Sequence, residues 1–226
     1  MSLAFARAGA DVVVTSRKLA ACEEVVAEIE ETTGRAALAY ACHLGRWDEI
    51  PGLVDAAYAR FGQVDVLVNN AGMSPVYDDV LDVTEKMYDS VLALNLKGPF
   101  RLTQLVGTRM KEQGSGTVIN VSSTGSLRPT GAIIPYAAAK SGLNAMTEGF
   151  AALLGPEVRV NTLMPGQYLT DISASWDMEF TRKMSGRLHL KRVGEPDEIV
   201  GAALFLASAA SSYTSGTVVR SDGGIP

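Results

Sequence analysis

The chain is 226 residues long, with 47% hydrophobic and 20% charged residues. This length is enough for one domain with a substantial core, and it argues against a second full domain. The net charge of −5 argues against nucleic acid as a partner, because nucleic-acid-binding surfaces are usually basic. We therefore expect residues 1–226 to form a single domain that does not bind nucleic acid.

Metal-binding and membrane-spanning roles are also disfavoured by the sequence. Cys22 and Cys42 do not have the spacing of metal ligands, and His43 and His189 are the only histidines. No apolar run reaches the ~18 residues that a membrane-spanning helix needs. We expect no metal site, reduced thiols, no membrane partner and a cytoplasmic location.

Short runs of β-branched residues alternate along the chain with longer helical stretches. In chain order, strands are expected at 12–15, 36–41, 64–68, 117–121, 158–163 and 217–219. Helices are expected at 19–31, 53–61, 84–111, 136–154 and 197–207. Apolar strands joined by helical crossovers form a parallel sheet covered on both faces. The predicted fold class is α/β, with a doubly wound, mostly parallel sheet.

Small and polar residues follow the expected strands. They are Ser16-Arg17, His43-Leu44, Asn69-Asn70-Ala71-Gly72, Ser122-Ser123 and Pro165-Gly166. In open α/β sheets, ligands bind beyond the carboxyl ends of the strands. Any one of these groups is compatible with ordinary loop chemistry, but together they predict a nucleotide site at this edge.

Tyr136 and Lys140 lie four residues apart in an expected helix, so their side chains share one face with roughly 5–6 Å between Cβ atoms. A nearby ammonium favours the phenolate and lowers the tyrosine pKa from ~10 toward neutral pH. Tyr136 would then be a general acid or base for a carbonyl or alcohol oxygen. Pro135 suits a helix start, which places Tyr136 in the first turn. An isolated Tyr-x-x-x-Lys is more often a plain surface pair.

Ser123 ends its strand thirteen positions before Tyr136, where its hydroxyl can bond the same substrate oxygen or simply cap a turn. Asn95 lies inside the long helix, and Pro99 has no N–H for the Asn95 carbonyl. We expect a kink there and a free carbonyl that can hold a water in reach of Lys140. The alternative is a plain proline kink with Asn95 facing solvent.

The order and spacing of these residues resemble the short-chain dehydrogenase/reductase family, in its single-domain branch, over essentially the whole chain. The matching residues are Asn69 to Gly72, Asn95, Ser123, Tyr136 with Lys140, Arg159-Val160-Asn161, Pro165-Gly166 and the closing Ser221 to Gly224. The resemblance implies a Rossmann-like fold that binds a nicotinamide cofactor, which carries the hydride chemistry itself.

The resemblance also implies roles for individual residues. The catalytic tetrad would be Asn95, Ser123, Tyr136 and Lys140. Tyr136 would exchange the proton, and Ser123 would position the oxygen. Lys140 would lower the tyrosine pKa and hold the nicotinamide ribose, while Asn95 would support a water relay. The residues implied to line the cofactor are Asn70, Ala71, Gly72, Pro165, Gly166 and Thr170.

The end of the first expected strand favours NADP(H) over NAD(H). NAD users commonly carry an acid there for the ribose hydroxyls, whereas this chain has Ser16 and Arg17. Arg17 can fork onto a 2′-phosphate, and the pair is similar to that of NADP-dependent carbonyl reductases. The alternative is a surface arginine that starts a helix. His43 stands where the family usually has Asp, and we interpret His43 and Leu44 as neighbours of the adenine.

The start of the sequence departs from the family pattern. Residues 1–10 resemble the latter part of a helix that normally follows a glycine-rich turn, and no Gly-x-x-x-Gly-x-Gly precedes them. We expect an N-terminally truncated sequence in which the first strand and glycine-rich loop, roughly 20 residues, are missing. That strand normally lies between the strands at Val12 and Val64, so we expect poor dinucleotide binding by residues 1–226.

Residues 168–192 resemble the family's substrate lid. Trp176, Met178, Phe180 and Met184 would give an apolar wall for a ketone or secondary alcohol of modest size, although such spacing also suits core packing. Family members are commonly homodimers or homotetramers that pack through the helices holding Asn95 and Tyr136. The apolar stripe Leu143, Met146, Phe150 and Leu154 is compatible with such an interface or with the core.

The leading function is therefore an oxidoreductase that transfers a hydride between NADP(H) and a carbonyl or secondary alcohol. The alternative is a fragment of the same family with impaired cofactor binding, or a non-catalytic scaffold. A nucleotide-sugar epimerase of the extended branch is disfavoured, because the segment after Pro165 is too short for that branch's substrate domain.

Overall fold

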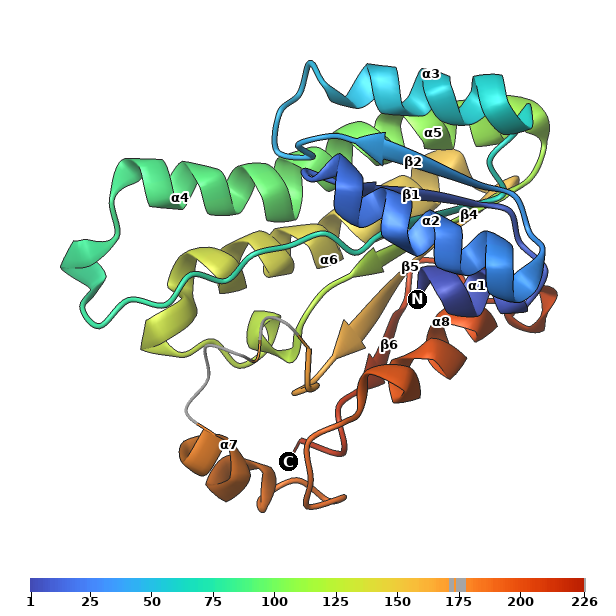
Figure 1. Ribbon diagram of the computed structural model, residues 1–226. Helices are drawn as coiled ribbons and strands as arrows, with labels where there is room; N and C mark the ends of the chain where they lie inside the picture. The colour runs from blue at the N-terminus through green and yellow to red at the C-terminus, as the bar shows by residue number, and fades with distance from the viewer. Residues whose placement is uncertain (171–172, 174–177, 226) are drawn as a thin grey trace.

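The computed structural model describes residues 1–170, 173 and 178–225 (Figure 1). Its strands are β1 (Val12–Ser16), β2 (Ala37–Ala41), β3 (Val66–Asn69), β4 (Gly116–Val121), β5 (Val158–Pro165) and β6 (Val218–Ser221). Strand β1 pairs with β2, and β3, β4, β5 and β6 are neighbours in that order. Every pairing is parallel, as predicted.

Helices connect the strands, as the alternation in the sequence predicts. The α-helices are α1 (Ser2–Arg7), α2 (Leu19–Thr33), α3 (Ile50–Phe61), α4 (Glu85–Leu92), α5 (Gly98–Gln113), α6 (Ile134–Leu154), α7 (Met178–Ser185) and α8 (Val200–Ala207). The 3-10 helices are η1 (Val80–Asp82), η3 (Thr124–Ser126), η4 (Gly131–Ile133), η6 (Pro196–Ile199) and η7 (Ala209–Ser211). None of the described helices is long and apolar enough to cross a membrane.

Helices cover both faces of the strands (Figure 1). On one face, α3, α5 and α6 contribute Leu53, Val106 and Phe150 to the largest buried cluster. On the other face, α8 buries Leu206 against β4 and β5, and α1 and α2 form a smaller cluster around Ile29. This layering confirms the doubly wound α/β fold, because a parallel sheet needs apolar cover on both sides.

The pairing of strands is interrupted between β1 and β3. Within the described residues, no ladder joins the pair β1–β2 to the four strands that begin with β3. The β3 valines Val66 and Val68 are only partly buried, and, like Met1 and Phe5 from the α1 region, they pack against the cluster that contains Leu206. The interruption lies between β1 and β3, and the missing strand stays a prediction.

The predicted long helix 84–111 is interrupted near its middle by a π-helix. Helix α4 runs into the π-helix η2 (Ala93–Lys97), and α5 starts directly after it with Pro99 in its first turn. Pro99 cannot donate an N–H to the carbonyl four residues back, so the regular ladder is broken at Asn95. The predicted irregularity is confirmed, and it takes the form of one wide turn.

Candidate active site

Ser123 lies directly after β4 and makes two kinds of contact. Its Oγ accepts the Gly125 N–H at 3.1 Å and thereby caps the short helix η3. The same hydroxyl lies near Tyr136, since a Cβ added at Gly125 would lie 3.4 Å from the Ser123 Oγ and 3.8 Å from the Tyr136 Cε1. The structure therefore shows the turn cap, and the bond from Ser123 to a substrate oxygen stays a prediction.

Tyr136 and Lys140 lie on one face of α6, at its first turns, with Pro135 in the position that suits a proline. The Lys140 Nζ lies 5.8 Å from the centre of the Tyr136 ring and donates to the Val121 carbonyl at 2.8 Å. Lys140 is only 3% exposed, and the Ser122 hydroxyl donates to its carbonyl. An ammonium group has three N–H donors, so two remain for a ligand beyond β4.

The pKa of Tyr136 moves in the direction opposite to the prediction. Burial raises the pKa of the phenol, and the nearby Ser123 hydroxyl offsets only part of that rise. Burial also lowers the pKa of Lys140 from 10.5 to about 8, because the low-dielectric surroundings disfavour its charge. The expected lowering of the tyrosine pKa by the ammonium is wrong for this structure, where desolvation of both groups dominates.

Asn95 is fully buried in the π-helix, which corrects the alternative that it faces solvent. Its Nδ2 donates to the carbonyls of Met73 and Val91, both at 2.9 Å, and its Oδ1 accepts the Met73 N–H at 3.3 Å. The side chain thus fixes the loop that follows β3. The free carbonyl and the water relay stay predictions.

The loop Asn70-Ala71-Gly72 brings backbone close to these groups. A Cβ added at Gly72 would lie 2.7 Å from the Asn95 Oδ1 and 3.6 Å from the Lys140 Nζ. No side chain fits there without displacing Asn95, so glycine permits the close approach. The structure therefore places Asn95 and Lys140 beside one glycine, and Lys140 in turn lies next to Tyr136, at the edge of the sheet where the strands end.

The residues predicted to hold the adenosine end lie together at the ends of β1 and β2. The Cys42 N–H donates to the Ser16 carbonyl, which places Ser16 and Arg17 next to the His43 loop. Both Ser16 and Arg17 are exposed. The His43 Nδ1 accepts the Gly45 N–H, and Leu44 lies so close to Gly98 that an added Cβ there would overlap the Leu44 carbonyl.

The residues predicted to frame the nicotinamide follow β5. Pro165 is the last residue of β5, and a Cβ added at Gly166 would lie 2.7 Å from the Asp222 Cα. Thr170 is exposed, and its carbonyl accepts the Ser173 hydroxyl at 2.6 Å. These positions share the carboxyl edge with the tetrad.

Two backbone hydrogen bonds close the base of the segment 168–192. The Leu169 N–H donates to the Gly194 carbonyl, and the Gly194 N–H donates to the Gln167 carbonyl, each at 3.0 Å. Helix α7 lies between these ends. Of the predicted apolar wall, Trp176 and the side chains of Met178, Phe180 and Met184 lie outside the described residues.

A buried polar row lies behind the site and was not predicted from the sequence. Asn69, Asn120 and Thr162 occupy one register across β3, β4 and β5. The Asn69 Nδ2 donates to the Asn120 Oδ1 at 2.7 Å, and the Asn120 Nδ2 donates to the Thr147 hydroxyl at 2.9 Å. The Thr147 hydroxyl lies 2.8 Å from that of Thr162. The row fixes the strand ends that carry the loops of the site.

The sequence of the whole chain matches a known family. The family whose description is "Enoyl-(Acyl carrier protein) reductase" matches residues 1–226. "Dehydrogenase/reductase SDR family member 4" of Homo sapiens is 36% identical over 224 residues, which are 98% of this chain and 80% of that relative. The chain belongs to the short-chain dehydrogenase/reductase family, whose members are NAD(P)-dependent oxidoreductases.

Two solved structures show the same fold with a cofactor bound. One is a gluconate 5-dehydrogenase from Burkholderia cenocepacia in complex with NADP and tartrate, with 30% identity, a TM-score of 0.92, and coverage of 98% of this chain and 88% of that one. The other is a 7α-hydroxysteroid dehydrogenase complexed with NADH and 7-oxo glycochenodeoxycholic acid, with 33% identity, a TM-score of 0.93, and coverage of 99% and 87%. These relatives use different cofactors and act on different substrates.

Proposed function

We propose that the protein transfers a hydride between NADP(H) and a carbonyl or secondary alcohol. The observation that carries the proposal is that Asn95 and Lys140 lie beside Gly72, Ser123 and Tyr136 lie beside Gly125, and Lys140 lies next to Tyr136, all at the carboxyl edge of the sheet. Parallel α/β sheets bind their ligands at this edge. Polar groups gathered there from three separate elements suit a reacting oxygen and the ribose of a cofactor.

The cofactor supplies the hydride when it is bound. In the reducing direction, Tyr136 donates its phenolic proton to the substrate oxygen, and Ser123 donates a hydrogen bond to the same oxygen. The raised pKa keeps the Tyr136 phenol protonated at neutral pH, which suits the reduction. Lys140 holds the ribose hydroxyls with the N–H groups that Val121 leaves available. Asn95 holds the loop that follows β3 through its two hydrogen bonds to the backbone of Met73.

The residues of the carboxyl edge fit a dinucleotide. The close contacts at Gly72 and Gly166 hold the loops after β3 and β5 against Asn95 and Asp222, beside the strand ends where a cofactor would lie. Arg17 is exposed at the end of β1, where its planar fork can bind a 2′-phosphate. These features support NADP(H) over NAD(H), with His43 and Leu44 beside the adenine.

Replacing Arg17 by Gln should raise the Kd for NADPH about 10- to 100-fold and leave the Kd for NADH within about twofold. The reason is that only NADPH carries the 2′-phosphate. Fluorescence titration of both cofactors measures the effect. Lys18→Gln is the matched control, since it removes the same charge one residue away. Equal losses for both cofactors in Arg17→Gln would contradict the proposed preference.

The segment 168–192 is proposed as the substrate lid. Backbone hydrogen bonds that join Gly194 to Leu169 and Gln167 close the base of this segment, so α7 lies within a single long loop. Such a loop beside the nicotinamide position can cover a substrate and exclude water. An apolar cover suits a ketone or secondary alcohol of modest size.

The first test is NADPH binding and turnover by the 226-residue protein, with a panel of ketones and aldehydes. Binding with turnover supports the reductase. A second candidate, a non-catalytic scaffold, is favoured by the interrupted pairing between β1 and β3, since dinucleotide would lie across that point. The discriminating variant carries a strand and glycine-rich turn grafted ahead of Met1. A failure of both proteins to bind NADPH would overturn the reductase in favour of the scaffold.

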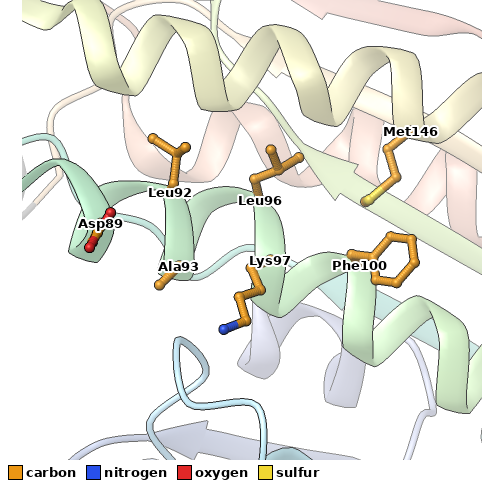
Figure 2. A pocket seen from close by; sticks show the side chains of 7 residues that line it. All are labelled: Asp89, Leu92, Ala93, Leu96, Lys97, Phe100 and Met146. Carbon is orange, nitrogen blue, oxygen red and sulfur yellow. The ribbon is translucent and has the colours of Figure 1, made fainter.

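We also propose a homodimer or homotetramer in the cytoplasm. A groove of about 670 Å³ runs along α4, η2 and α5 beside α6, and it is lined by Asp89, Leu92, Ala93, Leu96, Lys97, Phe100 and Met146 (Figure 2). Most of the lining is apolar, but Asp89 and Lys97 also line the groove. These two residues have opposite charges and lie eight residues apart along α4 and η2. A second copy related by a two-fold axis can place each charge against its opposite.

Buried, unpaired cysteines support a reducing compartment.

The predicted apolar stripe on α6 belongs mostly to the core. Leu143, Phe150 and Leu154 are each at most 8% exposed within the single chain, so only Met146 of the stripe lines the groove. The proposed interface therefore depends on Leu96 and Phe100 more than on α6.

Replacing Phe100 by Asp should shift the protein toward monomer, because a carboxylate at the centre of an apolar interface is desolvated without a partner. Phe100 is 41% exposed in the single chain, so the substitution leaves most of the core untouched. Sedimentation velocity measures the shift. Leu19→Asp, at a similarly exposed leucine on α2, is the control. An unchanged mass for Phe100→Asp would remove this groove as the interface.

A further inference from the structure

Tyr77 is a buried tyrosine to which the proposed reaction assigns no role. It lies in the loop between β3 and η1 and is 8% exposed. Its hydroxyl donates to the Gly131 carbonyl at 2.8 Å and accepts the Ile134 N–H at 2.9 Å. The two partners are 54 and 57 residues further along the chain. One hydroxyl therefore joins the loop after β3 to the start of α6.

The Ile134 N–H belongs to the first turn of α6, where the backbone N–H groups have few other hydrogen-bond acceptors. The first N–H groups of a helix have no intrahelical acceptor and need one from elsewhere. No side chain caps α6 at its N-cap residue Ile133, and Pro135 has no N–H. The Tyr77 hydroxyl therefore takes the part of a cap, supplied from a distant loop.

The catalytic tyrosine lies two residues beyond this bond. Tyr136 is in the same turn of α6, and Tyr77, Pro135 and Tyr136 belong to one closely packed group together with Pro75, Met87, Val91 and Ile133. The position of the Tyr136 phenol depends on the direction in which α6 starts. A bond to Ile134 fixes that start, and the bond to Gly131 fixes the turn before it.

The segment from Met73 to Tyr77 is held at both ends by groups of the site. At one end, Asn95 bonds both the N–H and the carbonyl of Met73. At the other end, Tyr77 bonds the turn that leads to Tyr136. The segment therefore connects two members of the tetrad that come from different helices.

We propose that Tyr77 is a positioning residue for the reaction, and that its hydroxyl sets the location of the Tyr136 phenol by clamping Gly131 and Ile134. The proposal rests on the proposed oxidoreductase function. Tyr77 acts through the backbone and touches neither cofactor nor substrate in this role. Its loss should therefore slow the chemical step and leave cofactor binding nearly unchanged.

The test is Tyr77→Phe, which removes both hydrogen bonds and keeps the ring. We expect kcat to fall about tenfold, because small displacements of a catalytic group are costly, with the KM for NADPH within roughly twofold. Amide exchange of the segment 127–136 should become about three- to tenfold faster. Tyr58→Phe is the matched control, since the Tyr58 hydroxyl is buried without a hydrogen-bond partner.

The outcomes separate this proposal from the proposed function. Unchanged kcat in Tyr77→Phe, or an equal change in kcat and in the KM for NADPH, overturns the positioning role. Unchanged exchange of segment 127–136 overturns the clamp itself. If the unsubstituted protein turns over no carbonyl, the proposed function fails, and the exchange measurement still decides whether Tyr77 holds the start of α6.

Discussion

Replacing Tyr136 by Phe lowers kcat for carbonyl reduction by about 10²–10⁴, the range expected when a general acid is removed. The ring keeps its place in α6, so the fold and the affinity for NADPH should be retained. Only the hydroxyl near Ser123, which protonates the substrate oxygen, is lost. Steady-state kinetics with the best carbonyl of the panel measure the effect.

Tyr88→Phe is the control for this substitution, because Tyr88 is an exposed tyrosine on α4. The pH dependence gives an independent check. Because burial raises the pKa of Tyr136, the phenol is protonated through the neutral range and reduction should be fastest there. Alcohol oxidation needs the phenolate and should rise as the pH becomes alkaline. A Tyr136→Phe variant that keeps most of its kcat would show that another group supplies the proton.

Replacing Lys140 by Met should abolish activity and yet stabilise the fold. Burial lowers the pKa of Lys140 from 10.5 to about 8, so the folded state carries its charge at a cost at neutral pH. A methionine removes that cost and leaves the Val121 carbonyl unpaired, which should give a net gain of about 1–3 kcal/mol in the free energy of unfolding at pH 7. Urea denaturation measures the gain.

The gain from Lys140→Met should depend on pH in a defined direction. Below about pH 8 the lysine is charged in both states, and the full cost is present in the folded protein. Between about pH 8 and 10.5 the folded state releases its proton first, so the stability contributed by this group rises with pH. The difference between variant and unsubstituted protein should shrink over that range. Lys86→Met, at an exposed lysine of α4, should show no such trend. A destabilised Lys140→Met at pH 7 would contradict the proposed cost.

Much of the site follows from local sequence patterns. The spacing of Tyr136 and Lys140, with Pro135 before them, predicts a shared helix face, and the structure has that face at the first turns of α6. Pro99 predicts an interruption at Asn95, and the π-helix occurs there. Both predictions depend on interactions within a few residues, which the sequence displays directly.

Other features depend on contacts between distant segments. The Tyr77 hydroxyl meets Gly131 and Ile134 only because β3 and β4 are neighbours and their loops leave the same edge. The polar row of Asn69, Asn120 and Thr162 likewise depends on the register of three strands. Nothing in the local sequence shows which of these residues pair with one another, because their partners are tens of positions away.

The sequence by itself determined the alternation of strands and helices and the parallel sheet, and it named the candidate tetrad, since these follow from periodicity, spacing and family resemblance. Only the tertiary structure decided the protonation behaviour of Tyr136 and Lys140. Spacing places an ammonium near a phenol, but the direction of each pKa shift depends on how much water the surrounding elements exclude. Burial under the loop after β3 raises one pKa and lowers the other, and that cover exists only in the folded chain.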